Sequence, residues 1–226
     1  MNRKELIKNA YRLTGSNNFY DGMITCSTLL GRAVSRLVWD MNKEDCTDYQ
    51  MQALLGIPEN FSGRLLEVPV GTGVITMPFY RTLSDADITC LDYSADMMSQ
   101  AKVKAIGLGL ENITFLQGDV GALPFRDNCF DAILSLNGFH AFPDKEAAYK
   151  ETFRVLKSGG VFCGCFYVSG CHKRTDWIIC HIYQPMKFFS PPYETMDSLR
   201  ERLGSMYIDL KLSNVKGIAC FNCRKE

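Results

Sequence analysis

Short apolar runs alternate with longer amphipathic stretches between Gly63 and Val168, and this alternation constrains the fold more than any other feature. A strand with one face in water alternates apolar and polar residues, whereas these runs are largely apolar throughout. Such runs predict parallel strands covered by helices on both faces, and therefore an α/β fold. The predicted strands are RLLEVPV, DITCLDY, NITFLQGD, CFDAILSL and GVFCGCFYV, and the intervening helices pass through Phe79 and Leu83, over about 95–106 and over about 145–156.

The flanking segments carry weaker patterns. Before the alternation, helical spacing predicts helices through 7–13, through 30–38 and over about 49–55, separated by a polar, glycine-bearing loop at 14–22. After Val168 we expect a short helix at 177–182, a break at 190–194, a helix over 196–203 and two closing strands, YIDLKLS and IACFNCRK.

The length and the charge balance limit the class of protein. The chain has 226 residues and no linker rich in Pro, Gly or Ser, which predicts one domain over 1–226. Within it we expect a helical cap (1–60), a core (63–168) and a closing segment (169–226) on the acceptor side. Lys+Arg and Asp+Glu both number 25, so the net charge is zero and nucleic acid is not an expected partner.

The N-terminal sequence MNRKELIKNA lacks the apolar core of a secretory signal. No apolar window reaches the length of a membrane-spanning helix. We therefore expect a cytoplasmic protein, a monomer or a homodimer, whose partner is a small molecule.

Ten cysteines are many for that compartment. Most lie in apolar runs, for example Cys90 and Cys163, where a reduced thiol acts as a small buried hydrophobe. Cys220 and Cys223 resemble half of a zinc site, but on a strand residues three apart point to opposite faces. Zinc sites usually combine two recognisable halves, so no metal is predicted.

A glycine-bearing turn joins the first predicted strand to the next helix, in LLEVPVGTGVIT (65–76). Gly71 and Gly73 let the backbone turn tightly and approach a ligand. The helix that follows begins with free N–H groups. Alone, such a turn does not identify a ligand-binding loop, because glycine is common in turns of every kind.

Acidic residues end the next two predicted strands. Asp92 lies about 20 residues beyond the turn, where a nucleotide-binding α/β fold places a carboxylate on the ribose hydroxyls. The alternative role of Asp92 is to cap the following helix, for which Ser94 competes. Asp119 either accepts from an adenine amino group or is an ordinary turn residue. Because the carboxyl ends of parallel strands share one edge, the three features together predict a nucleotide-type ligand.

Five ordered motifs resemble the class I methyltransferases, in particular the type-11 group that includes the ubiquinone/menaquinone C-methyltransferases. The resemblance implies an α/β, Rossmann-like, doubly wound fold: a seven-stranded, mostly parallel sheet with an antiparallel last strand, and an N-terminal helical cap. It also implies an enzyme that methylates a small acceptor by in-line transfer from S-adenosyl-L-methionine, releasing S-adenosyl-L-homocysteine. The motifs are EVPVGTG, LDYSADMM, LQGD, LPFRDNCFDAILSLNGFHAFPD and RVLKSGGVF.

The resemblance further implies which residues bind the cofactor, from its methionine part through the ribose to the adenine. Pro69 departs from the family pattern by replacing the first glycine of the loop, which removes an N–H donor and fixes φ. The implied cofactor residues are Glu67, Gly71, Thr72 and Gly73 at the methionine part, Asp92 at the ribose, Tyr93 and Met97 on the ribose and adenine, Asp119 and Val120 at the adenine edge, and Leu136 and Asn137 near the methionine amine.

Candidates for the acceptor side are fewer. Phe19 and Tyr20 lie where this family often folds a lid over the cofactor, and Tyr20 is a candidate catalytic residue. His140, in NGFHAF, is a second one, because an imidazole with a pKa of ~6.5 can act as a base. The alternatives are ordinary packing for Phe19 and Tyr20 and a structural role for His140.

Two other functions share part of the pattern. A nicotinamide-dependent dehydrogenase also uses a Gly-x-Gly turn and a distant acid, but Thr76 stands at the position where that fingerprint has Gly or Ala. A catalytically silent, methyltransferase-like binding protein would keep the cofactor residues without turnover. Cofactor binding distinguishes the first alternative, and methyl transfer the second.

Overall fold

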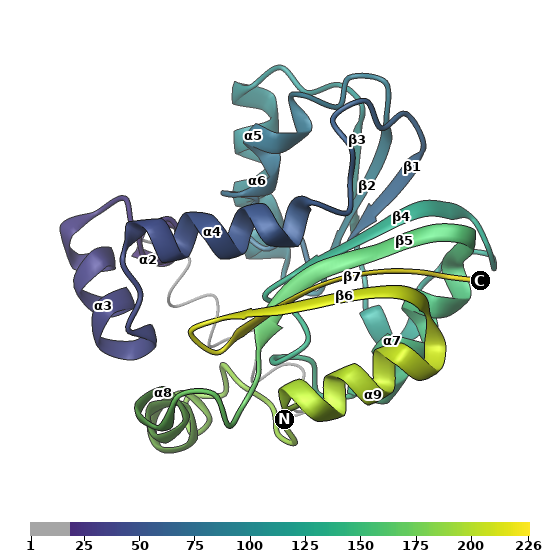
Figure 1. Cartoon of the computed structure of the whole chain (residues 1–226). Coiled ribbons are helices and arrows are strands. Elements are labelled where there is room, and N and C mark those ends of the chain that lie inside the picture. Colours follow the sequence, from purple (N-terminus) through teal and green to yellow (C-terminus); the bar gives the residue numbers. More distant parts are fainter. Residues whose placement is uncertain (1–18) are drawn as a thin grey trace.

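Seven strands form one twisted sheet in the order β3-β2-β1-β4-β5-β7-β6 in the computed structural model, which describes residues 19–226 (Figure 1). The strands are β1 Arg64–Glu67, β2 Asp87–Asp92, β3 Ile113–Gln117, β4 Phe130–Leu136, β5 Leu156–Tyr167, β6 Ile208–Val215 and β7 Ile218–Arg224.

Five of the strands, β1 to β5, are parallel, and β7 runs antiparallel to both β5 and β6. The chain therefore builds the sheet outward from β1 to β3 and then returns to add β4 on the other side of β1. Open α/β sheets bind ligands at such a reversal, outside the carboxyl ends of the strands. The predicted fold class, including the antiparallel last strand, is confirmed.

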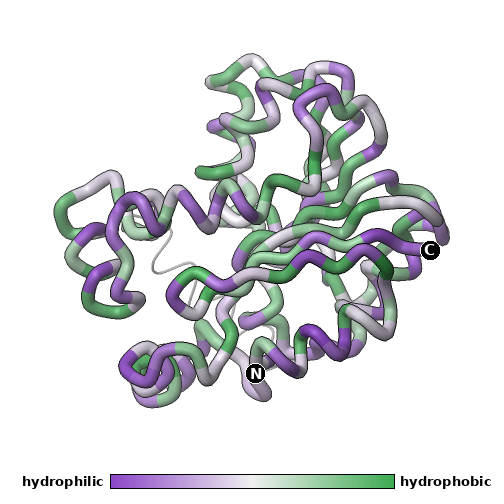
Figure 2. Tube along the Cα trace, in the orientation of Figure 1, coloured by the Kyte–Doolittle hydropathy of each residue, from purple (hydrophilic) through white to green (hydrophobic). Residues whose placement is uncertain are grey.

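Buried side chains form two cores, one on each face of the sheet. Successive strand residues alternate between them: Leu65 packs in one core and Leu66 in the other. Cys220 and Cys223 are divided in the same way, which confirms that they do not share a face. Figure 2 shows hydrophobic stretches along the sheet and hydrophilic stretches on α9 (Met196–Met206).

The helices that cross between strands follow the predicted pattern. Helix α5 ends at Tyr80, so the predicted continuation through Leu83 is wrong, because the chain leaves the helix in tight turns before β2. The bounds of these helices are α5 Thr76–Tyr80, α6 Ala95–Gly107, the short 3-10 helix η1 Val120–Ala122, α7 Lys145–Val155, α8 Lys173–Ile178 and the π-helix η2 Ile179–Tyr183.

The N-terminal helices of the described chain are α2 Phe19–Ile24, α3 Leu29–Trp39 and α4 Lys43–Leu54. The loop predicted at 14–22 is wrong over 19–22, which are helical. Gly31 of α3 permits close packing on this helix, since a Cβ on Gly31 would lie 2.1 Å from the Gly22 carbonyl oxygen. Helix α4 begins earlier than predicted because Asn42 and Asp45 form a capping box. The helix predicted through 7–13, and 14–18 of the loop, lie outside the described residues.

The close pairing of β4 with β5 allows the packing of this sheet to be tested. A Cβ on Gly164 would lie 2.0 Å from the Ser135 carbonyl oxygen in the neighbouring strand. We expect Gly164→Ala to lower the free energy of unfolding by more than about 2 kcal/mol, because the strands must move apart.

Chemical denaturation measures this loss. Gly204→Ala in α9 is the matched control, since its Cβ would meet nothing within 4 Å. Alanine there should stabilise the helix by about 1 kcal/mol. Equal stability of wild type and Gly164→Ala would contradict the described packing of β4 on β5.

Candidate functional site

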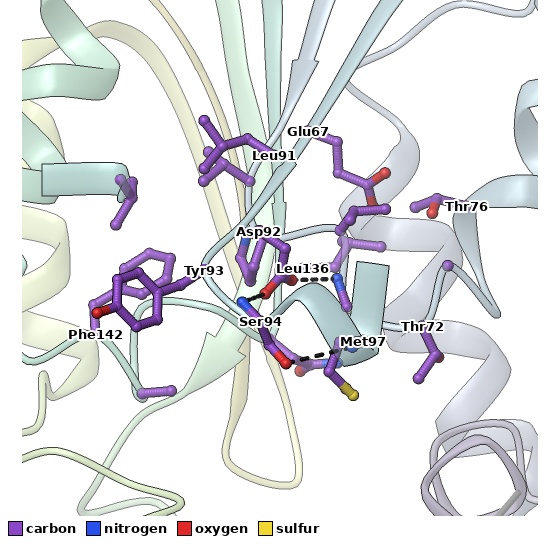
Figure 3. Close-up of a pocket in the computed structure, with 18 of the residues that line it drawn as sticks. Glu67, Thr72, Thr76, Leu91, Asp92, Tyr93, Ser94, Met97, Leu136 and Phe142 are labelled. Atoms are coloured by element: carbon purple, nitrogen blue, oxygen red, sulfur yellow. Dashed lines mark hydrogen bonds between the residues drawn. The ribbon is translucent and has the colours of Figure 1, made fainter. Parts of the chain in front are cut away.

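A cavity of ≈ 140 Å³ lies at the carboxyl ends of β1, β2, β3 and β4, where the strand order reverses; we call it the glycine-loop cavity. Every residue expected to bind the cofactor lines it. These residues are Glu67, Gly71, Thr72, Gly73, Asp92, Tyr93, Met97, Asp119, Val120, Leu136 and Asn137. Figure 3 shows that the side chains it labels come from separate strands and loops around one space.

The two glycines of the loop have different roles. Both have left-handed backbone, with φ of 55° at Gly71 and 68° at Gly73. A Cβ on Gly73 would lie 2.8 Å from Met77 Cγ, so this glycine permits packing of the loop on α5. A Cβ on Gly71 would meet only Met97 Cε, at 3.9 Å. Gly71 therefore leaves room beside the cavity for a ligand. The Val68–Pro69 peptide bond that precedes it is cis.

Asp92 ties the glycine loop to the end of β2. Its Oδ2 accepts from Gly71 N at 2.7 Å, and its Oδ1 accepts from Ser94 N at 2.8 Å. Ser94, with its hydroxyl 3.3 Å from Met97 N, is the cap of α6, so the alternative role for Asp92 does not hold. Burial raises the pKa of Asp92 to about 6. Each carboxylate oxygen can accept a second bond, which leaves capacity for ligand hydroxyls.

Glu67 lies deeper, at the end of β1, and is buried. Its Oε2 accepts from the Tyr80 hydroxyl at 2.9 Å and from the Cys90 thiol at 3.4 Å. Burial raises the pKa of Glu67 to about 8, although these hydrogen bonds favour its charged form. The carboxyl faces the cavity beside Thr76 (Figure 3), and its raised pKa favours the protonated form at neutral pH.

The opposite side of the cavity is aromatic and acidic. Tyr93 and Phe142 lie together there (Figure 3). Asp119 Oδ1 accepts from Gly121 N at 3.0 Å and caps η1, as the turn interpretation predicted, while the side chain also lines the cavity. The two interpretations of Asp119 are therefore compatible.

Helix α2 closes the cavity from the N-terminal side. Asp21 accepts from the Thr72 hydroxyl at 2.5 Å and forms an ion pair with Lys104 of α6 at 2.9 Å. These contacts bind α2 to both the glycine loop and the helix behind it. Tyr20 and Ile24 of α2 line the cavity as a result.

A second, larger cavity of ≈ 300 Å³ adjoins the first, and we call it the apolar cavity. Tyr20, Ile24 and Asn137 line both cavities and form the boundary between them. None of the described residues that line the apolar cavity is Asp, Glu, Lys or Arg. Its walls are mainly aromatic or aliphatic and include Phe19, Trp39, Tyr49, Tyr183, Phe188 and Phe189.

His140 lies in the wall of the apolar cavity and is only 6% exposed. Its ring stacks on Phe189, with 4.2 Å between centroids. Its Nδ1 accepts from the backbone N–H of Tyr167 at 3.2 Å. Since a peptide N–H only donates, Nδ1 carries no proton and the neutral ring is protonated at Nε2. Burial lowers the pKa of His140 to about 3.

Several lining residues were not predicted from the sequence. Ala141, Phe142 and Pro143 follow β4, and Ile24 comes from α2. The first three stand in the motif NGFHAFPD that carried the resemblance, so their place in it was a usable signal. Ile24 had no such signal, because the polar stretch before it predicted a loop.

The described residues hold no group of three or more His, Cys, Asp or Glu side chains that could bind a metal ion. Nor does any helix within 19–226 have the length and apolarity needed to cross a bilayer.

Comparisons with known proteins agree with this geometry. A family model described as "Methyltransferase domain" matches residues 65–160. Demethylmenaquinone methyltransferase of Thermus thermophilus is 38% identical over 97 residues, which are 43% of this chain and 44% of that protein. The rice protein 2-methyl-6-phytyl-1,4-hydroquinone methyltransferase 2, chloroplastic, is 33% identical over 100 residues, or 44% of this chain and 28% of that protein. The matches thus span less than half of these relatives.

Solved structures share the fold over a longer stretch. A Thermotoga maritima S-adenosylmethionine-dependent methyltransferase, described as a possible histamine N-methyltransferase, superposes with a TM-score of 0.69 at 15% identity, covering 100% of both chains. A Haloferax volcanii methyltransferase complex with the Trm112 activator gives a TM-score of 0.67 at 16% identity, covering 95% of this chain and 97% of that chain. At such identities the likeness shows the fold alone.

The buried Glu67 predicts an unusual pH dependence of stability. Its pKa rises from 4.5 to about 8 on folding, so the folded chain keeps a proton that the unfolded chain releases. This group therefore lowers the free energy of unfolding as the pH rises from 4.5 to 8, with a slope of at most about 1.4 kcal/mol per pH unit.

We expect Glu67→Gln to flatten the fall in melting temperature between pH 6 and pH 8. The amide still accepts from Tyr80 but carries no ionisable proton. Glu59→Gln, at an exposed position, is the control and should follow the wild type. Parallel pH profiles for wild type and Glu67→Gln would mean that Glu67 is ionised in the folded chain.

Proposed function

We propose that this chain, whose residues 65–160 match a family model described as a methyltransferase domain, is an S-adenosylmethionine-dependent methyltransferase acting on a small-molecule acceptor. The observation that carries the proposal is the convergence of the glycine loop, Asp92 and Asp119 on one cavity. We further propose that 1–226 is a single domain, with a helical cap over 1–60, the core over 63–168 and an acceptor-side segment over 169–226. We propose a cytoplasmic location as well.

The residues that line the cavity suit the chemistry of the cofactor. Gly71 leaves open space where a side chain would stand, and Asp92 retains capacity for the two ribose hydroxyls. Tyr93, Met97 and Val120 would offer apolar surface to the ribose and adenine, and Asp119 would accept from the adenine edge. The backbone at Leu136 and Asn137 would approach the methionine amine.

Glu67 would meet the charged methionine part. When bound, the cofactor supplies a sulfonium that carries an activated methyl group. A nearby cation favours the ionised form of a buried carboxyl, so Glu67 would lose its proton and offset part of its burial cost. Tyr20 and Ile24, fixed through Asp21, exclude water from the boundary between the two cavities and align the acceptor with the methyl group.

The acceptor occupies the apolar cavity in this proposal. Its walls carry no formal charge, so a neutral, largely apolar acceptor is favoured over a charged metabolite. Flat aromatic side chains suit an aromatic acceptor of comparable shape. The names of the relatives include a demethylmenaquinone and a 1,4-hydroquinone methyltransferase, which supports a hydroquinone-type acceptor.

For His140, the geometry favours a hydrogen-bond donor over a base. Nδ1 is already occupied by the Tyr167 N–H, and taking a second proton would bury an imidazolium. The protonated Nε2 can instead donate to an oxygen of the acceptor and orient it. Tyr20 is suited to the same kind of role, because burial beside Asp21 and Asp92 raises its pKa and keeps the phenol protonated.

The two alternatives make different predictions for the same cavity. A dehydrogenase would bind NAD in preference to S-adenosylhomocysteine. A silent binding protein would bind the cofactor and transfer its methyl group to nothing. The neutral apolar cavity beside the cofactor residues favours the enzyme over the silent protein.

Calorimetry with S-adenosylhomocysteine tests the cofactor assignment. We expect Asp92→Asn to weaken binding by about ten- to hundredfold, from the loss of charge-assisted hydrogen bonds of roughly 1.5–3 kcal/mol. Asp96→Asn, exposed in the first turn of α6, is the matched control and should bind as the wild type does. Tight binding of NAD, with none of S-adenosylhomocysteine, would overturn the assignment.

Transfer of radiolabelled methyl groups to reduced 1,4-naphthoquinone tests the role of His140. We expect His140→Phe to lower kcat/KM by about ten- to hundredfold and His140→Asn, which keeps a donor, to lose less. Wild type and His140→Phe should show the same pH profile between about pH 5 and pH 8. An acidic limb that disappears only in His140→Phe would identify a base.

A further inference from the structure

Large apolar side chains are exposed on α3 and on the segment from α8 to the end of η2 and just beyond. Within 19–226, Leu30 and Leu37 of α3 are 62% and 63% exposed, and Trp177 and Met186 are 57% and 51% exposed. Ile182 lies between the last two and is 42% exposed. We call these five residues the exposed apolar patch.

The two segments lie at the same end of the molecule (Figure 1). Arg174 of α8 joins them, donating to the Arg36 carbonyl at 2.9 Å and to Asp40 Oδ1 at 3.2 Å. On α3, Leu30 and Leu37 are two helical turns apart and share a stripe with Val34. The buried stripe of α3 is a different one, formed by Gly31, Ser35 and Val38.

The apolar cavity reaches the surface at this patch. Val34 lines the cavity and belongs to the exposed stripe of α3. Met186 lines the cavity from the other segment and is itself half-exposed. The patch is therefore continuous with the wall of the cavity.

Positive charge surrounds the patch although the whole chain is neutral. Helix α3 contains Arg32 and Arg36 and no acid. Residues 171–189 contain Lys173, Arg174 and Lys187 against one acid, Asp176.

Two acids lie close to these cations and both are engaged. Asp176 faces inward, where it accepts from the Tyr167 hydroxyl at 2.7 Å and from Gly170 N at 3.1 Å. Asp40, at the end of α3, lies within 4.0 Å of Arg36, Arg174 and Lys216. The surplus at the surface is therefore cationic.

We propose that this face docks on an anionic lipid bilayer, so that the apolar cavity opens toward the membrane surface. Amphipathic helices that lie in the interface place Leu and Trp among the headgroups and Lys and Arg against anionic lipids, which is the combination found here. The docking stands on the surface alone. The further step, that an apolar acceptor enters the cavity from the bilayer, rests on the proposed function.

Flotation of the full-length protein with vesicles tests the docking. We expect it to float with equimolar phosphatidylcholine–phosphatidylglycerol vesicles and much less with phosphatidylcholine alone, and added salt should weaken the binding. Absence of flotation with both compositions at low salt would overturn the proposal.

Two pairs of variants locate the surface. Leu30→Ser with Leu37→Ser, and Lys173→Glu with Lys187→Glu, should each lower the bound fraction by about tenfold or more. The matched controls are Val103→Ser with Ile106→Ser, exposed apolar positions on α6, and Lys150→Glu with Lys211→Glu, exposed lysines elsewhere. Equal losses in the controls would show nonspecific adhesion and overturn the assignment to this face.

Two further measurements separate the outcomes. Sedimentation velocity detects the other occupant of such a face, a second copy of the chain: a dimer that the leucine variants convert to monomer, with no vesicle binding, would overturn the proposal. Calorimetry with S-adenosylhomocysteine should give wild-type affinity for every variant, because none of the changed residues lines the glycine-loop cavity. Flotation without S-adenosylhomocysteine binding would remove the proposed function and leave the docking intact.

Discussion

The hydrogen bond from Gly71 N to Asp92 Oδ2 connects the two structural features on which the site depends. It joins the turn after β1 to the end of β2, across the edge where the strand order reverses. The left-handed backbone at Gly71 brings the N–H to this position, and the buried end of β2 fixes the carboxylate. Without this bond the loop and the strand end would be two separate features, and the cavity would lose a shared wall.

The burial of two carboxyls makes the site unfavourable for the stability of the fold, and this bond offsets only part of that effect. Asp92 and Glu67 are both buried, and the pKa of each is raised because desolvation outweighs the hydrogen bonds to it. Among the described residues, no cation forms an ion pair with either carboxyl. Lys104 pairs with Asp21 instead. Two buried carboxyls that face one cavity destabilise the unliganded protein. This arrangement is best explained by a ligand whose hydroxyls and positive charge stabilise the carboxylates.

The sequence predicted most of the sheet and of the residues at its edge, but little of how α2 closes the N-terminal side of the site. Largely apolar runs at β1, β2 and β4 indicate buried parallel strands, and the residues that end such strands lie on one edge of the sheet because the strands share a direction. By contrast, the N-terminal face of the site depends on Asp21 reaching Thr72 and Lys104, contacts between residues far apart in the chain that no local pattern encodes. The tautomer of His140 was equally hidden, because it is fixed by the backbone N–H of Tyr167 in another strand.

Helix α2 couples the two cavities physically. One side of it is held to the glycine loop through Asp21, while Tyr20 and Ile24 form the boundary with the apolar cavity. A shift of α2 that admits a ligand to one cavity must therefore change the wall of the other. Thr72 is the contact point, and its neighbours Gly71 and Gly73 both have the left-handed backbone that residues with a side chain rarely adopt. If the chain has the proposed function, cofactor binding at the loop and acceptor entry behind α2 would both depend on the position of this helix, and each would alter the other.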